Sequence, residues 1–218
     1  MSGSGFIHRF VPGSGPSVLV LLHGTGGDEH SLLPLGAALA PGAPMLSPRG
    51  QVLEGPHARF FRRIAEGVFD QDDLRRRTED LASFLQGAIA QHELQGKRLI
   101  AVGFSNGANI AASLLLRRPG LIHEAVLFRA MLPFEPETLP VLQGTRVWLG
   151  AGRRDPIVPH ASIERLAAVL REAGAAVRLD WWDSGHQLEA DEVADARRWF
   201  EAAAQQGSAS GTVLDSAR

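Results

Sequence analysis

Short, continuously apolar runs alternate with amphipathic stretches along most of the chain. Strands that are buried on both faces require continuous rather than alternating hydrophobicity, so each run predicts a strand. The runs occupy residues 18–22, 98–104, 125–128, 146–150 and 177–182, with a weaker one at 45–46.

The stretches between these runs have the residue spacing of helices. In the stretch 72–94, Leu74, Leu81 and Leu85 recur on one face. Two aspartates lie near its beginning, and acidic residues there stabilise a helix N-terminus. At the beginning of the stretch 162–173, Ser162 and Arg165 form an incomplete capping box. The predicted helices occupy residues 72–94, 106–118, 162–173 and 189–205.

The alternation of strands and helices indicates βαβ units. It predicts an α/β fold with a mostly parallel central sheet and helices on both faces. The chain has 218 residues, and a single domain of this size buries roughly 70% of its unfolded surface. We expect the domain to span residues 1–206 and the small, polar segment 207–218 to be a disordered tail.

Composition narrows the range of partners. The hydrophobic share of 44% and the charged share of 21% are typical of a soluble globule. A net charge of −2 gives no reason to expect nucleic acid or an anionic membrane as a partner. The apolar runs are far shorter than the ~20 residues that span a bilayer. The first residues lack the basic region and apolar core of a signal peptide, so we expect a cytoplasmic protein without stable membrane insertion.

The residue types that the chain lacks exclude several kinds of chemistry. Without cysteine there can be no disulfide framework, thiolate metal site or cysteine nucleophile, and without tyrosine no tyrosine acid or base. Lys97 is the only lysine, and it belongs to no Walker-type phosphate loop. The eight histidines form no H-E-x-x-H motif or other ligand cluster, so we expect no metal site.

The most informative motif is a G-x-S-x-G pattern, Gly103-Phe104-Ser105-Asn106-Gly107. With the glycine and serine content of this chain, such a pattern would arise by chance in roughly one chain in six. Here, however, the pattern follows a predicted strand and opens a predicted helix. That is the context of the sharp turn that presents a nucleophilic serine, so Ser105 is the candidate nucleophile.

A serine hydroxyl is a poor nucleophile unless the chain also supplies a base and an orienting acid. Asp155 and His186 each follow a later predicted strand, which would bring both to the carboxyl edge of the sheet with Ser105. Asp183 is an alternative acid, but it shares a loop with the histidine, which makes independent orientation harder. We interpret His160 and His123 as structural, because one would neighbour the acid and the other precedes the wrong strand.

A second glycine-rich loop, residues 23–29, follows the first strong strand. Acyl transfer develops negative charge on a carbonyl oxygen, which two preorganised backbone N–H donors stabilise by roughly 3–4 kcal/mol each. We expect the amides of Thr25 and Asn106 to be these donors. A phosphate loop is disfavoured, because no G-x-G-x-x-G is completed and no lysine follows. We interpret His23 as a buried structural histidine.

Together these motifs resemble the phospholipase/carboxylesterase family of α/β-hydrolases, which includes acyl-protein thioesterases and bacterial carboxylesterases. The likeness covers roughly residues 18–200 and rests on Leu22-His23-Gly24-Thr25-Gly26-Gly27, Gly103-Phe104-Ser105-Asn106-Gly107-Ala108, Gly152-x-x-Asp155-Pro156-Ile157-Val158-Pro159 and Gly185-His186. The resemblance implies an α/β-hydrolase fold without a large cap domain or cofactor. It also implies a catalytic triad of Ser105, His186 and Asp155. The amides of Thr25 and Asn106 would then form the oxyanion hole. Many members have glutamine in place of Asn106 and another residue in place of Thr25, which affects the shape of the pocket.

Segment 49–71 has the least regular pattern. It resembles the corresponding region of a bacterial branch associated with hydroquinone or quinone responses. As a short lid over the site it would offer Phe60, Phe61 and Phe69 as walls of an acyl pocket, with Met131 and Leu132 lining the same pocket. A solvated surface loop with a few core aromatic residues is an equally open interpretation.

We therefore predict a cofactor-independent serine carboxylesterase that hydrolyses small-molecule esters through an acyl-enzyme on Ser105. An acyl thioesterase or lysophospholipase on the same triad is the alternative among enzymes. A non-catalytic, ligand-binding homologue is the alternative from a different class. A homodimer is compatible with the sequence, which contains nothing that specifies one.

Overall fold

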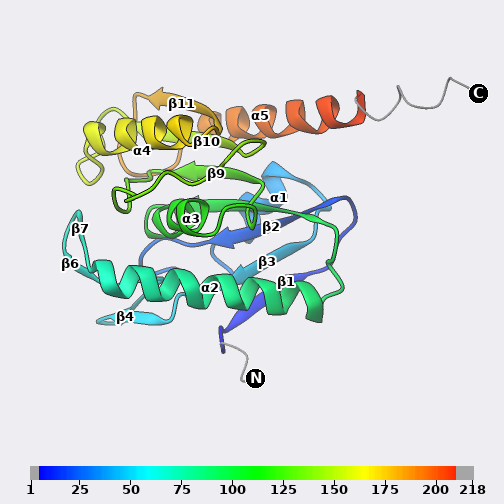
Figure 1. The fold of residues 1–218 in the computed structure, drawn as a ribbon, viewed down its shortest axis with the longest axis horizontal. Helices are drawn as coiled ribbons and strands as arrows, with labels where there is room; N and C mark the ends of the chain where they lie inside the picture. The colour runs from blue at the N-terminus through cyan, green and yellow to red at the C-terminus, as the bar shows by residue number, and fades with distance from the viewer. Residues whose placement is uncertain (1–4, 210–218) are drawn as a thin grey trace, which may run out of the picture.

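The fold is built on a seven-stranded sheet in the order β1-β3-β2-β8-β9-β10-β11, as seen in a computed structural model that describes residues 5–209 (Figure 1). Only β1 is antiparallel to its neighbour, and the other neighbouring strands are parallel. The strands are β1 (His8–Val11), β2 (Ser17–Leu22), β3 (Met45–Pro48), β8 (Arg98–Phe104), β9 (Glu124–Phe128), β10 (Arg146–Gly152) and β11 (Ala176–Trp182).

Helices cover both faces of this sheet (Figure 1). They are α1 (Leu33–Leu39), α2 (Gln71–Gln91), α3 (Asn106–Arg117), α4 (His160–Glu172) and α5 (Ala190–Ala209). The central strand β2 explains the continuous hydrophobicity, because Val18 and Val20 pack in the core on the side of α2, α3 and α4. Leu19 and Leu21 pack on the opposite side with residues of α1 and α5. The predicted α/β-hydrolase fold is confirmed, and residues 5–209 contain no large cap domain.

All four predicted helices begin within two residues of their observed starts, and those at 106–118 and 162–173 also end within one residue of the observed ends, as is usual for boundaries read from a pattern. The capping box expected at Ser162 is wrong. The helix begins two residues earlier, at His160 with Pro159 before it, and the Ser162 hydroxyl instead accepts a hydrogen bond from the Leu132 amide. Helix α5 continues to Ala209, into the segment predicted as a tail, and residues 210–218 lie outside the described residues.

Neither the edge strand β1 nor the short helix α1 was predicted from the sequence. Strand β1 is only partly buried and includes His8 and Arg9, so it lacks the apolar run that marks the central strands. Within residues 5–209, no helix is both long enough and apolar enough to cross a bilayer.

Segment 49–71 forms two small hairpins rather than an irregular loop. One pairs β4 (Val52–Glu54) with β5 (His57–Arg59), and the other pairs β6 (Arg63–Ala65) with β7 (Val68–Phe69). Asp70 then caps α2 by accepting a hydrogen bond from the Asp73 amide. The hairpins therefore lead directly into α2.

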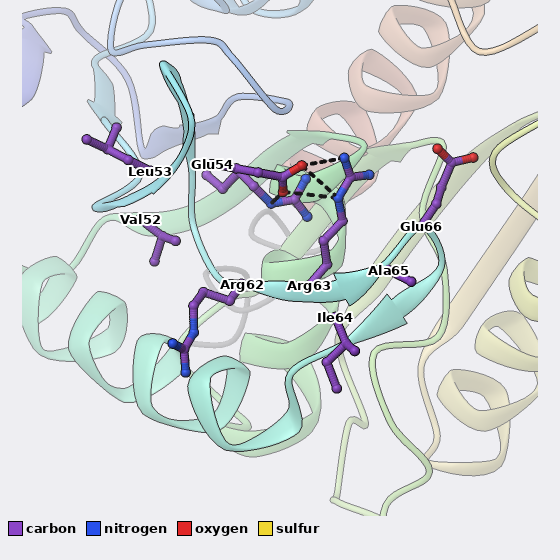
Figure 2. Close-up of a pocket in the computed structure, with 9 residues that line it drawn as sticks. Val52, Leu53, Glu54, Arg62, Arg63, Ile64, Ala65 and Glu66 are labelled. Carbon is purple, nitrogen blue, oxygen red and sulfur yellow. Dashed lines mark hydrogen bonds and ion pairs between the residues drawn. The ribbon is translucent and has the colours of Figure 1, made fainter.

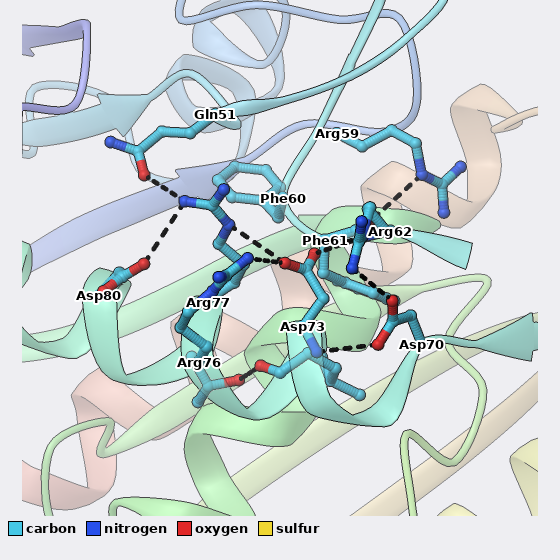
Figure 3. Close-up of polar contacts among 12 residues, drawn as sticks. Gln51, Arg59, Phe60, Phe61, Arg62, Asp70, Asp73, Arg76, Arg77 and Asp80 are labelled. Carbon is cyan, nitrogen blue, oxygen red and sulfur yellow. Dashed lines mark hydrogen bonds and ion pairs between the residues drawn. The ribbon is translucent and has the colours of Figure 1, made fainter. Parts of the chain in front are cut away.

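The buried carboxylate of Asp73 ties the chain between the hairpins to the first turns of α2 (Figure 3). It accepts a hydrogen bond from the Arg62 amide at 2.8 Å and forms ion pairs with Arg76 and Arg77 on its own helix. Phe60 and Phe61, which precede Arg62, are 1% and 0% exposed. This part of the segment is thus held at the protein core.

Candidate active site

Ser105 lies at the sharp turn between β8 and α3 and has a backbone conformation that side-chain-bearing residues rarely adopt. Its φ is 52° and its ψ −115°, and such strained conformations are common at functional sites. Gly107 allows this turn, because a Cβ there would overlap the carbonyl group of Leu22 at the end of β2. The first turn of α3 therefore lies directly against the central strand, with Ser105 at the carboxyl edge of the sheet.

His186 and Asp155 lie beside Ser105 in one continuous chain of hydrogen bonds. The Nε2 atom of His186 is 3.0 Å from the Ser105 Oγ, and its Nδ1 is 2.8 Å from the Asp155 Oδ2. A carboxylate can only accept, so Nδ1 carries the proton and Nε2 is free to accept the serine proton. The other carboxylate oxygen of Asp155 accepts hydrogen bonds from the amides of Ile157 and Val158, which fixes the side chain. This arrangement can activate a hydroxyl for attack on a carbonyl carbon.

The other acidic and histidine residues considered from the sequence do not join this chain. The side chain of Asp183 is 77% exposed and pairs with Arg154, whereas that of Asp155 is 1% exposed. The His160 ring contacts the carbonyl group of Arg153, and the His123 ring accepts a hydrogen bond from a backbone amide. Asp155 is therefore the carboxylate that the geometry favours.

A fully buried arginine, Arg129, holds the loop that contains His186. Its guanidinium donates to the carbonyl groups of Gly185 and Gln187, on either side of the histidine, and to the Ser184 hydroxyl. It also forms two hydrogen bonds to the carboxylate of Glu192 on α5, one of them at 2.9 Å. Its Nε lies 3.8 Å from the Asp155 Oδ2, so the same guanidinium also faces the carboxylate that contacts His186.

Sequence reasoning missed this arginine and its partner. Both side chains are 0% exposed, and charged residues are almost never fully buried unless they are paired. One signal was available: Arg129 directly follows the apolar run 125–128, at the sheet edge where the candidate site lies. Glu192 is 63 positions further along the chain, and its pattern on α5 is that of a solvated helix face.

We expect the Arg129→Met variant to be less stable than the wild type by about 3–5 kcal/mol, because it leaves the carboxylate of Glu192 buried without its partner. The free energy of unfolding from urea titration measures this. Adding Glu192→Gln should recover part of the loss. Arg165→Met, which removes a half-exposed pair with Glu135, should change the stability by less than about 1 kcal/mol. Equal losses in the two single variants would contradict this account of the buried pair.

The two candidate oxyanion donors lie in the same cavity as the serine. Thr25, Ser105, Asn106 and His186 all line this cavity, which has a volume of about 340 Å³. The loop that contains Thr25 is fixed by His23, whose Nε2 accepts from the Gly50 amide and whose Nδ1 donates to the Gly24 carbonyl. Burial lowers the pKa of His23, so the ring is neutral in this structural role, as the sequence led us to expect.

The structure brings only some of the predicted acyl-pocket walls to the cavity. Phe69 and Met131 line the cavity at Ser105, but Phe60, Phe61 and Leu132 do not. Phe60 packs against the ring of His23 and Phe61 against the ring of Phe69, both inside the protein core. Leu132 packs at the edge of the same core.

Charged side chains of the two hairpins take the place of the missing aromatic walls. Arg59, Arg63 and Glu66 line the cavity together with Phe69, so segment 49–71 borders the site mainly with charged groups. Within residues 5–209, no group of three His, Asp or Glu side chains is placed to hold a metal ion.

Comparisons with known proteins agree with the fold and the motifs. The sequence model of the phospholipase/carboxylesterase family matches residues 62–203. A putative hydrolase of Bacillus subtilis, MhqD, is 45% identical over 196 residues, which are 90% of this chain and 98% of that protein. Among solved structures, the Bacillus cereus carboxylesterase is 44% identical with a TM-score of 0.89, covering 91% of this chain and 94% of that one. A structure of YahD with malic acid is 31% identical with a TM-score of 0.87, covering 91% and 99%.

Proposed function

Because this chain belongs to the phospholipase/carboxylesterase family of α/β-hydrolases, we propose that it is a serine carboxylesterase that hydrolyses esters of small carboxylic acids. The observation that carries the proposal is the hydrogen-bonded chain Ser105–His186–Asp155 at the edge of a cavity. Each of the three side chains follows a different strand of the parallel sheet, at its carboxyl end, which is where open α/β sheets place their sites.

The reaction begins with attack of the Ser105 hydroxyl oxygen on the ester carbonyl carbon. As the C–O bond forms, the hydroxyl proton moves to the Nε2 of His186, and the Asp155 carboxylate stabilises the imidazolium. The carbonyl oxygen becomes an oxyanion, which accepts hydrogen bonds from the backbone amides of Thr25 and Asn106. Each of these donors contributes about 3–4 kcal/mol to stabilisation of the transition state.

Collapse of the tetrahedral intermediate breaks the bond between the carbonyl carbon and the alcohol oxygen. His186 gives its proton to the departing alcohol, which leaves an acyl group on Ser105. A water molecule then attacks the acyl carbon and transfers its proton to the same Nε2. The second collapse releases the carboxylic acid and returns the proton to the serine oxygen.

The size of the cavity favours small substrates. A volume of about 340 Å³ lies near the lower end of the roughly 300–1,000 Å³ found for small-molecule sites. Among the relatives, the Bacillus cereus protein is a carboxylesterase and the YahD structure contains malic acid, a small carboxylic acid. The first supports ester hydrolysis, and the second supports a substrate with a short acyl group or a small alcohol.

A chain-length series tests this proposal. We expect kcat/KM for 4-nitrophenyl acetate and butyrate to exceed that for the octanoate and palmitate esters by at least about tenfold, because longer chains do not fit the cavity. An acyl thioester of butyrate and a lysophospholipid, measured in parallel, should be poorer substrates. A maximum at palmitate or a preference for the thioester would replace the proposal with a lysophospholipase or a thioesterase. Absence of turnover with all substrates would indicate a ligand-binding homologue.

A further inference from the structure

A buried arginine forms part of the cavity wall beside Ser105. Arg59 is only 4% exposed and lies at the end of β5. Its Nη1 donates to the Thr25 hydroxyl at 2.6 Å, and its Nε donates to the Phe61 carbonyl at 3.2 Å. A guanidinium has five N–H donors, and the residues from 5 to 209 provide hydrogen-bond acceptors for only these two of its nitrogen atoms.

The positive charge of Arg59 is only partly balanced. Its nearest carboxylate, Glu54, lies 3.4 Å from its Nε but forms closer hydrogen bonds, at 2.6–3.1 Å, with Arg63. Figure 2 shows this pair at a second cavity of about 440 Å³, whose wall also includes Arg59. Burial, and after it the positive charge of Arg63, lowers the pKa of Arg59. Glu66 also lines both cavities, with the opposite charge to Arg59 and Arg63.

The backbone around Arg59 is fixed, so the guanidinium is preorganised. The amide of the next residue, Phe60, donates to the Asn106 Oδ1 at 2.7 Å, and the amide of Arg62 is bound by Asp73 (Figure 3). A group held in this way loses little conformational entropy when it binds a ligand.

Asn106 adds a second donor without an acceptor. Because its Oδ1 accepts from the Phe60 amide, its Nδ2 is the donor end of the side chain. This Nδ2 is buried and has no hydrogen-bond partner among residues 5–209, although Asn106 lines the cavity at Ser105. An unsatisfied buried donor is costly, and this one lies on a residue of the cavity wall.

We propose that Arg59 recognises a carboxylate on the substrate, so that the preferred substrates are esters with a second, free carboxylate on the acid or the alcohol. The inference rests on the proposed esterase activity and names the substrate class of that site. A planar guanidinium pairs with a carboxylate through two parallel hydrogen bonds. In a partly closed cavity such a pair is screened less by water than it is at the surface.

Two matched pairs of esters test the inference. Mono-4-nitrophenyl succinate is compared with 4-nitrophenyl butyrate, and 4-acetoxybenzoate with 4-acetoxybenzamide, so that the charge lies first on the acid and then on the alcohol. In at least one pair we expect kcat/KM for the charged ester to exceed that for the neutral ester by about 10–100-fold. In the Arg59→Met variant this ratio should fall to about 2 or less. The ratio is unaffected by a general loss of activity that acts on both esters.

Arg75→Met is the matched control, because it removes the same charge from the half-exposed outer surface of α2. It should keep the wild-type ratios. Equal ratios in the wild type and Arg59→Met would overturn the inference and leave the esterase proposal standing, whereas absence of turnover of all four esters would overturn the esterase proposal itself.

A second measurement, inhibition of the wild-type protein, is independent of the folding of any variant. Succinate should inhibit hydrolysis of the neutral ester at least about tenfold more strongly than succinamide does, and equal inhibition would overturn the inference.

Discussion

Replacing Asp155 by asparagine is expected to lower kcat for ester hydrolysis about 10⁴-fold while leaving the fold intact. The amide has the shape of the carboxylate, and its oxygen can still accept the hydrogen bonds from Ile157 and Val158. Its NH₂ group, however, can donate to the Nδ1 of His186. The imidazole then carries its proton on Nε2, where it can no longer accept the proton of Ser105. Stopped-flow or steady-state hydrolysis of 4-nitrophenyl acetate measures the loss.

Asp183→Asn is the matched control for this prediction, because it makes the same change in a carboxylate on the His186 loop that is 77% exposed. Its kcat should remain within about twofold of the wild type. A large loss in Asp183→Asn together with a small one in Asp155→Asn would make Asp183 the orienting acid and reject the geometry described here.

Replacing Ser105 by alanine is expected to have the largest effect, a loss of at least about 10⁴-fold and up to about 10⁶-fold in kcat. The change removes the only atom of Ser105 that forms the acyl-enzyme and leaves the His186–Asp155 pair in place. The backbone strain at this position is the same for alanine as for serine, so the variant should fold. Ser83→Ala, on the exposed face of α2, provides a control that should retain full activity.

The central fold and the candidate triad could be predicted from the sequence for one physical reason. Strands buried on both faces must be continuously apolar, so runs such as 18–22 and 98–104 mark the sheet unambiguously. The carboxyl ends of neighbouring parallel strands meet at one edge of a sheet. Ser105, Asp155 and His186, each just beyond such an end, were therefore expected to lie together.

The charged residues that complete the site could not be predicted in the same way. Arg129 and Arg59 have partners that are distant along the chain, and a charged side chain gives no periodic signal of burial. Their environment depends on packing that only the folded chain creates. The Arg129 pair lies between a strand end and α5, and Arg59 joins the loop of Thr25 to the chain at Phe61.

Aromatic residues in an irregular segment present the opposite problem. Phe60, Phe61 and Phe69 are equally apolar, and the sequence does not say which of them faces a cavity. Phe60 and Phe61 are turned into the core, where His23 and Phe69 cover them, and only Phe69 also reaches the cavity. The difference arises because the Asp73 and Asn106 hydrogen bonds fix the backbone between the two hairpins.

Covalent labelling with a fluorophosphonate tests the central claim most directly, because the reagent reacts with a serine only when a base activates it. Intact-protein mass spectrometry, followed by peptide mapping, identifies the residue that is modified. We predict one phosphonyl group per chain, located on Ser105, and no adduct in the Ser105→Ala variant under the same conditions. Labelling of Ser105→Ala to the wild-type extent, or an adduct on a different serine of the wild type, would contradict the account.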